Sequence, residues 1–238
     1  MIEIKNLEKS YKDKKILKGI NMSIKKGSFT ALVGSNGAGK STLVDIICKS
    51  KKANSGSIDY SFNEKNIFDE IGVQIQDARF DSRMKIKEII DLWKEIYKKR
   101  EIADIESLID LMELRHILDN KSDKISGGQR QKLNILLTLF HNPQLLIFDE
   151  LTTGLDASSR DNIHEYLKLI NENGKTIFMV SHYMDEVEAL CDMVYFLKDG
   201  VIAYEGSPQF IKEKYNCNSL QDFVKTHLND KNKGGLKL

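Results

Sequence analysis

One short stretch of this 238-residue chain has the residue types that bind a polyphosphate. It consists of Gly34, Ser35, Asn36, Gly37, Ala38, Gly39, Lys40, Ser41 and Thr42, and its first eight residues match G-x-x-x-x-G-K-[ST]. Glycines let backbone N–H groups approach phosphate oxygens, and a helix N-terminus adds partial positive charge. We expect Lys40 to reach the β- and γ-phosphates and the Ser41 hydroxyl to ligate Mg²⁺.

Two acidic residues follow a second apolar stretch, residues 145–148. We expect Asp149 to hold Mg²⁺ through water and Glu150 to polarise an attacking water. Two acids at the end of a strand often only face solvent. The phosphate-binding pattern in the same chain favours the catalytic interpretation over that one.

Hydrophobic periodicity predicts the elements that position these residues. Short buried strands are predicted at 29–33, 145–148, 176–180 and 193–197, separated by helical segments, one of which begins near Lys40. This alternation predicts an α/β fold with a mainly parallel sheet. The first thirty or so residues alternate as β structure, residues 55–77 resemble short strands and loops, and Asp199-Gly200 is a hairpin signal.

A change of period marks a helical region inside the chain. Apolar residues recur at helical spacing from residue 84 to 118, which predicts an inserted helical lobe. Ser126 and Gln129 then have the S-x-x-Q spacing of a capping box, and Pro143 ends the helix that follows.

Charge and composition exclude several classes of protein. The 36 Lys and Arg residues nearly cancel the 35 Asp and Glu residues, leaving a formal net charge of +1. This balance argues against a dedicated nucleic-acid binder and against disorder. The three cysteines have no zinc-site spacing and suit a reducing cytosol. The first residues have no signal-peptide core, and no apolar stretch approaches the ~18 residues of a membrane span, so we expect a soluble chain.

A third motif gives these features a family context. Together with the first two motifs, Ile125-Ser126-Gly127-Gly128-Gln129 closely resembles the ATP-binding cassette (ABC) family of ATPases, whose signature is LSGGQ. Ile125 replaces the leucine, and the signature lies about twenty residues before Asp149, as the family expects. Alone, this motif is also compatible with a capped, glycine-rich helix start.

The resemblance extends over nearly the whole chain. It implies that Tyr11 stacks on adenine, that Gln76 is a catalytic glutamine that also ligates Mg²⁺, and that Asp156 belongs to the D-loop. It also implies that His182, which follows a predicted strand, contacts the γ-phosphate. The alternatives are a surface tyrosine and a structural histidine. One departure is Leu151, where the family usually has proline; because the chemical groups are all present, we expect an active ATPase.

The family implies a fold and a mode of assembly. The fold would be a P-loop NTPase core with a mainly parallel sheet, an N-terminal antiparallel β subdomain and a helical subdomain at roughly 78–140. Residues 1–238 would form one nucleotide-binding domain with a tail at 206–238. Two such domains bind two ATP molecules head to tail, so that Ser126 and Gly128 contact the γ-phosphate bound by the opposite subunit.

The resemblance also implies partners. The segment 205–208 followed by 218–223 resembles the tail of ABC-2 type exporter ATPases, although a plain terminal amphipathic helix would fit too. The chain would then be a peripheral subunit on the cytoplasmic face of the membrane, paired with itself or a homologue. It would touch the membrane only through a separate permease, near Arg79 and Phe80. Three alternatives are also ATPases: an importer subunit, a soluble cassette for iron–sulfur assembly or cell division, and a nucleic-acid-linked member, which the charge balance disfavours. A fourth is a non-enzymatic binding module, and the Asp149-Glu150 pair argues against it.

Overall fold

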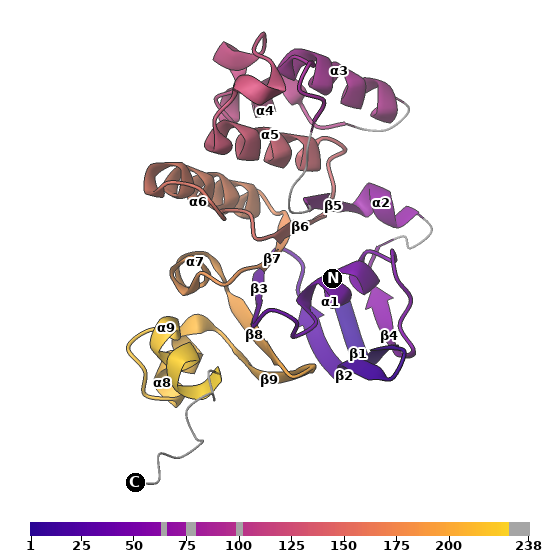
Figure 1. Ribbon diagram of the computed structural model, residues 1–238, viewed down its shortest axis with the longest axis vertical. Helices are drawn as coiled ribbons and strands as arrows, with labels where there is room; N and C mark the ends of the chain where they lie inside the picture. The colour runs from indigo at the N-terminus through magenta and orange to yellow at the C-terminus, as the bar shows by residue number, and fades with distance from the viewer. Residues whose placement is uncertain (63–65, 75–79, 99–101, 229–238) are drawn as a thin grey trace. The chain divides into compact units, whose positions relative to one another are not determined.

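The computed structural model describes residues 1–62, 66–74, 80–98 and 102–228 (Figure 1). The chain forms two compact units. Unit 1 contains residue 1, residues 25–27 and residues 60–179, and unit 2 contains residues 2–24, 28–59 and 180 onwards.

Unit 2 contains a β subdomain from the start of the chain. Strand β1 (Ile2–Tyr11) pairs antiparallel with β2 (Lys14–Ile24), and β4 (Ser55–Tyr60) lies on the other side of β1. Alternate side chains are buried, among them Ile2, Ile4 and Met22. The prediction of alternating β structure over the first thirty residues is therefore confirmed.

Three further strands of unit 2 position the glycine-rich loop. Strand β3 (Phe29–Gly34) pairs parallel with β8 (Met193–Lys198), and β9 (Val201–Gly206) returns antiparallel to β8. Asp199 and Gly200 both have positive φ, 50° and 84°, as a tight hairpin turn requires. Helices α1 (Lys40–Ile47) and α7 (Met184–Leu190) belong to the same unit. The predicted strands, the helix start near Lys40 and the hairpin are confirmed.

The end of the described chain packs on these strands. It comprises α8 (Pro208–Lys214), α9 (Leu220–Phe223) and a π-helical turn (Val224–Leu228). The fully buried Phe223 ring lies 5.0 Å from the Phe196 ring of β8 and 5.1 Å from the Tyr204 ring of β9, measured between centroids. Aromatic contacts therefore fix the tail helices to the β8–β9 hairpin.

Unit 1 contains three more strands. Strand β5 (Ile71–Gln74) pairs parallel with β6 (Leu145–Asp149), and β7 (Thr176–Val180) is the next neighbour of β6. All four residues of the predicted strand 145–148 are fully buried. Helix α6 (Ala157–Glu172) connects β6 to β7. The region 55–77 contains the predicted short strands but also a one-turn helix, α2 (Ile67–Glu70), which the sequence pattern did not indicate.

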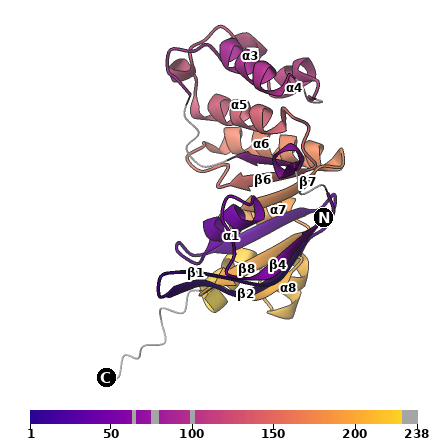
Figure 2. The same ribbon diagram turned by 90° about the vertical axis from the view of Figure 1, so that its right-hand side faces the viewer.

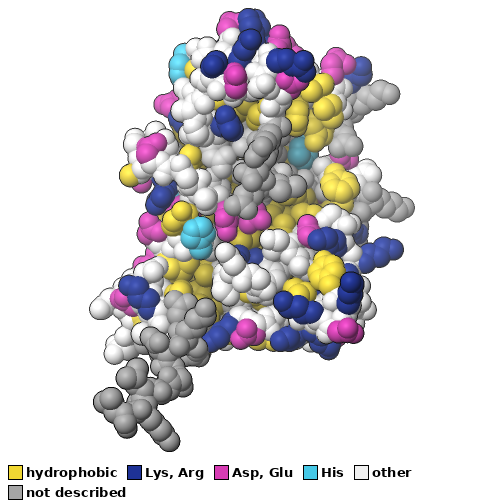
Figure 3. Space-filling view, in the orientation of Figure 1, with side chains coloured by type: hydrophobic (Ala, Val, Ile, Leu, Met, Phe, Trp, Pro, Cys, Tyr) yellow, Lys and Arg dark blue, Asp and Glu magenta, His cyan; other side chains and the backbone are white. Residues whose placement is uncertain are grey.

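The predicted helical lobe is also part of unit 1. It comprises α3 (Ile86–Tyr97), α4 (Ile105–Leu111), two 3₁₀ turns (Arg115–Ile117 and Ser122–Lys124) and α5 (Gly127–Leu139), which lie together in both views (Figures 1 and 2). Ile86, Ile89 and Ile90 are buried, as their spacing predicts. Basic and acidic side chains are interspersed over α3 and α4 (Figure 3), and Lys87, for example, pairs with Asp119 at 2.6 Å.

The parallel strand pairs, the β subdomain and the inserted helices together confirm the predicted α/β fold class. Within the described ranges, no helix combines the length and the apolar composition that crossing a bilayer requires.

Candidate functional site

The glycine-rich loop lies in unit 2, between β3 and α1. Its middle, formed by Ser35, Asn36 and Gly37, is exposed, whereas Ala38 and Gly39 are buried. The Ala38 amide donates to the Ser35 carbonyl over 3.1 Å, which closes a tight turn inside the loop. The loop is therefore anchored at its end and open to solvent in its middle.

Gly39 is required by the backbone at the start of α1. Its φ of 113° is unfavourable for residues with a side chain, and a Cβ there would lie 2.8 Å from Cδ2 of Leu17. Gly39 occupies the N-cap position of α1, so no side chain there caps the helix, and the first turn carries no acidic residue. The first N–H groups of α1 are thus suited to an anion.

The Lys40 side chain holds the glycine-rich loop together through hydrogen bonds to its backbone. The residue is only 8% exposed, and its Nζ donates to the carbonyl oxygens of Gly34 over 2.7 Å and Ser35 over 3.2 Å. A buried ammonium group, an uncapped helix N-terminus and exposed loop amides are the groups that hold a polyphosphate. The exposed Ser41 follows directly and suits a Mg²⁺ ion. The residues present therefore fit the phosphates of ATP with Mg²⁺.

The other two predicted contacts of unit 2 are Tyr11 and His182. Tyr11 ends β1 with 42% of its surface exposed, and the Nζ atoms of Lys9 and Lys51 lie 5.2 and 5.6 Å from its ring centroid. His182 is exposed and follows the buried Ser181, whose amide donates to the Leu32 carbonyl of β3 over 3.3 Å. His182 is thus tied to the strand that leads into the glycine-rich loop.

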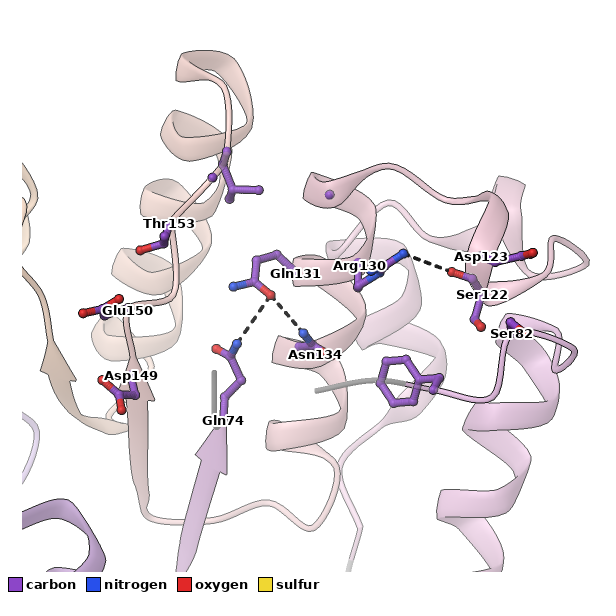
Figure 4. Close-up of a pocket in the computed structure, with 14 residues that line it drawn as sticks. Gln74, Ser82, Ser122, Asp123, Arg130, Gln131, Asn134, Asp149, Glu150 and Thr153 are labelled. Carbon is purple, nitrogen blue, oxygen red and sulfur yellow. Dashed lines mark hydrogen bonds between the residues drawn. The ribbon is translucent and has the colours of Figure 1, made fainter. Parts of the chain in front are cut away.

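The acidic pair lies in unit 1, at the end of β6. Asp149 is the last residue of the strand, and Glu150 follows with a φ of 52°. Both line a cavity of about 540 Å³ whose other polar lining residues include Gln74, Gln131, Asn134 and Thr153 (Figure 4). Gln76, the glutamine predicted for catalysis and for Mg²⁺, lies outside the described residues.

Three amide side chains in this cavity form a hydrogen-bonded group that sequence reasoning did not find. Gln131 Oε1 accepts from Asn134 Nδ2 over 2.9 Å and from Gln74 Nε2 over 3.4 Å (Figure 4). Gln131 Nε2 donates to the Leu151 carbonyl. A signal for Asn134 is present in the sequence, because it is a polar residue on the apolar face that Leu133 and Leu136 continue. No motif singled out Gln131 or Gln74.

The signature residues of unit 1 form the start of α5. The Gln129 amide donates to Ser126 Oγ over 3.2 Å, and the Ser126 amide donates to Gln129 Oε1 over 2.9 Å, so the predicted capping box is confirmed. A Cβ on Gly128 would lie 2.7 Å from Ser159 Oγ, so a side chain there would displace the Ser159 hydroxyl. Gly127 begins the helix.

Asp156 caps the next helix. Its Oδ1 accepts from the Ser159 amide over 2.9 Å and its Oδ2 from the Ser159 hydroxyl over 2.8 Å. These two hydrogen bonds lower the pKa of the Asp156 carboxyl. The structure gives this residue a role at the N-terminus of α6, and its role at a nucleotide stays a prediction.

Known proteins resemble this chain in sequence and in fold. A family model described as ABC transporter matches residues 17–153. Linearmycin resistance ATP-binding protein LnrL of Bacillus subtilis (strain 168) is 35% identical over 208 residues, which cover 84% of this chain and 67% of that protein. Nod factor export ATP-binding protein I of Rhizobium meliloti (strain 1021) is 33% identical, covering 92% of this chain and 68% of that protein.

An import protein is similarly related. Methionine import ATP-binding protein MetN of Clostridium acetobutylicum is 34% identical over 219 residues, covering 87% of this chain and 68% of that protein.

Among solved structures, a dimeric ATP-binding cassette in a post-hydrolysis state, bound to ADP and Pi, matches with a TM-score of 0.74 and 26% identity. That match covers 87% of this chain and 98% of the other.

Proposed function

Because the chain belongs to the ABC transporter family, we propose that it hydrolyses ATP with Mg²⁺ as the nucleotide-binding subunit of a transporter. The observation that carries the proposal is the closed glycine-rich loop, with Lys40 buried beneath it on two loop carbonyls. The acidic pair Asp149 and Glu150 at the end of β6 supplies the second half of the chemistry.

The loop of unit 2 binds the phosphates. The loop amides and the first amides of α1 donate to phosphate oxygens, and the Lys40 ammonium moves from the Gly34 and Ser35 carbonyls to the β- and γ-phosphates. Tyr11 stacks on the adenine ring. When bound, Mg²⁺ neutralises phosphate charge, and Ser41, Asp149 and Gln76 are the residues that hold it.

The acidic pair completes the hydrolytic step. Glu150 accepts the proton of the attacking water at a carboxylate oxygen, and His182 orients the γ-phosphate. Catalysis is then mainly positioning and charge stabilisation, because the phosphoryl group needs little covalent help from the protein.

Dimerisation completes each site. One chain has one glycine-rich loop and one signature, so two chains placed head to tail build two sites. Ser126, Gly127, Gly128 and Gln129 stand at the N-terminus of α5, where a helix favours an anion, and Asp156 stands at the start of α6. ATP stabilises the closed dimer because it binds that form better than the open one. The dimeric cassette bound to ADP and Pi supports this arrangement.

The partner we propose is a separate membrane permease, and the direction is export. Support comes from the relative named for Nod factor export, from the relative named for linearmycin resistance and from the tail that resembles ABC-2 exporters. The permease would dock near Phe80, on the cytoplasmic face of the membrane; Arg79 lies outside the described residues. Import is the second candidate, favoured by the methionine import relative.

The hydrolytic role is tested by Glu150→Gln, with Glu165→Gln on the exposed face of α6 as the matched control. We expect turnover to fall at least about a hundredfold while ATP binding is kept, since removing a general base has that effect. The variant should elute as a dimer from a sizing column in Mg-ATP. Turnover equal to that of the parent would remove Glu150 from the reaction.

The transport role is tested in membranes. A tagged full-length chain should copurify with a multi-span permease from detergent-solubilised membranes of its host. Recovery with soluble assembly or division proteins alone would contradict the transport part and leave the ATPase chemistry standing.

A further inference from the structure

The backbone that carries Glu150 is held in an unusual conformation. Glu150 has a φ of 52°, a region that residues with a side chain rarely adopt. Its carbonyl accepts from the Thr153 amide over 3.2 Å, and the next side chain, Leu151, is only 2% exposed. Such a conformation persists only where the surrounding structure fixes it. What fixes it here therefore bears on where the Glu150 carboxylate points.

The amide of Gln131 reaches this turn from α5. Gln131 Nε2 donates to the Leu151 carbonyl. A carbonyl oxygen only accepts hydrogen bonds, so this contact fixes which end of the Gln131 amide faces the turn. Gln131 Oε1 then faces away and accepts from Asn134 and Gln74. Both ends of the Gln131 side chain are thus occupied, in a single orientation.

A gain in folding stability does not explain the presence of these three buried amides. Gln74 and Asn134 are 5% and 6% exposed, and Gln74 Oε1 and Asn134 Oδ1 accept no hydrogen bond within the part of the chain that the structure describes. A partly satisfied polar network is less stable than an apolar packing of the same volume. What the three amides achieve instead is a hydrogen bond to the carbonyl of Leu151, the residue that follows Glu150.

We infer that Gln131 is a positioning residue for hydrolysis, which holds the Glu150–Leu151 turn so that the Glu150 carboxylate faces the attacking water. This inference rests on the proposed function. The residue type at position 151 explains why a hydrogen bond that restrains this turn matters in this chain. A proline there would fix its own φ, but leucine leaves that torsion free, and the Gln131 hydrogen bond restrains the turn from outside.

The test uses the full-length chain and the variant Gln131→Met, which keeps the side-chain length and removes the amide. Loss of one buried hydrogen bond, expressed in the transition state, lowers kcat about tenfold. The KM for ATP should stay within about twofold of the parent, because Gln131 is not among the residues that the proposed function assigns to ATP binding. Gln144→Met, at an exposed glutamine of the same unit, should match the parent.

A second variant and a rescue separate positioning from a merely structural role. Gln131→Asn keeps the amide one methylene shorter and should lower kcat similarly in a folded protein. Adding Leu151→Pro to Gln131→Met should restore most of the lost kcat, because the ring restrains the same turn. Leu151→Pro alone should change kcat less than about twofold.

The outcomes distinguish this inference from the proposed function. If the parent hydrolyses ATP and Glu150→Gln stops it, but Gln131→Met and Gln131→Asn keep the parent kcat, the positioning role is overturned and the ATPase stands. A loss of kcat that Leu151→Pro fails to restore also overturns it. If the parent does not hydrolyse ATP, the proposed function itself fails.

Discussion

The glycine-rich loop of unit 2 and the acidic turn of unit 1 are built in different ways. The loop is held by neighbours in sequence: Lys40 donates to carbonyls five and six residues away. The acidic turn is held from a distance, because Gln131 lies 20 residues before Leu151, and Gln74 lies 57 residues before Gln131. One part is shaped by its own backbone, the other by side chains from a strand and a helix.

This difference explains which residues a sequence reveals. A loop that needs Gly39 at a φ of 113° has few choices of residue type and fixed spacing, so it leaves a motif. A turn supported by Gln131 and Asn134 needs amides at the right place in space, and several chain positions can supply them. The glycine-rich loop should therefore lose its function when its own residues are substituted. The acidic turn should lose its function when residues distant in the sequence are substituted.

The largest effect should follow from the core beneath the acidic turn. Leu151→Ala removes a side chain that is 2% exposed and should lower the free energy of unfolding by about 3 kcal/mol. Leu169→Ala, at an apolar residue of α6 that is 41% exposed, should change it by less than about 0.5 kcal/mol. Urea unfolding of both variants measures the difference. Equal losses would mean that burial of Leu151 does not support the turn.

The next largest effect is expected on ATP affinity, when Lys40 of the glycine-rich loop is substituted. Lys40→Met removes the ammonium group that the proposed function places on the β- and γ-phosphates, and a hydrogen bond to a charged group is worth about 1.5–3 kcal/mol. ATP affinity measured by calorimetry should fall about ten- to a hundredfold. Lys18→Met, on the exposed face of β2 in the same unit, is the control and should bind like the parent. An affinity unchanged by Lys40→Met would place phosphate binding elsewhere.

The smallest effect is the pH dependence of stability at the cap of α6, which follows the acidic turn in unit 1. The pKa of Asp156 is lowered by its hydrogen bonds with Ser159, so the folded state favours the carboxylate. Its stabilisation is complete above the ordinary aspartate pKa of about 3.9 and is lost as pH falls through the lower folded value. The stability difference between the parent and Asp156→Asn should therefore shrink on acidification below about pH 4. A difference that stays constant as the pH falls through and well below about 4 would show that the charge of Asp156 is irrelevant to the cap.

Much of the fold could be predicted from sequence because its elements carry local signals. The buried strands, the capping box at Ser126 and the Asp199-Gly200 hairpin each follow from a few neighbouring residues. Helix α2 was missed, since four residues are too few for a helical period to show. Of the candidate site, the glycine-rich loop and the position of Asp149 and Glu150 at the end of β6 were predicted. The roles of all these residues at the nucleotide stay predictions, and so do those of Tyr11, Gln76, Asp156 and His182.

The sequence by itself determined the chemistry that this protein carries: Lys40 in a glycine-rich loop, and two carboxylates at the end of a strand. These features are local, and residue types at fixed spacing are sufficient to encode them. Only the tertiary structure decided that Gln131 faces the carbonyl after Glu150 and that Gln74 and Asn134 face Gln131. Hydrogen bonds between side chains depend on distance and direction in space, which the packing of α5 against β5 sets and which no spacing along the chain records.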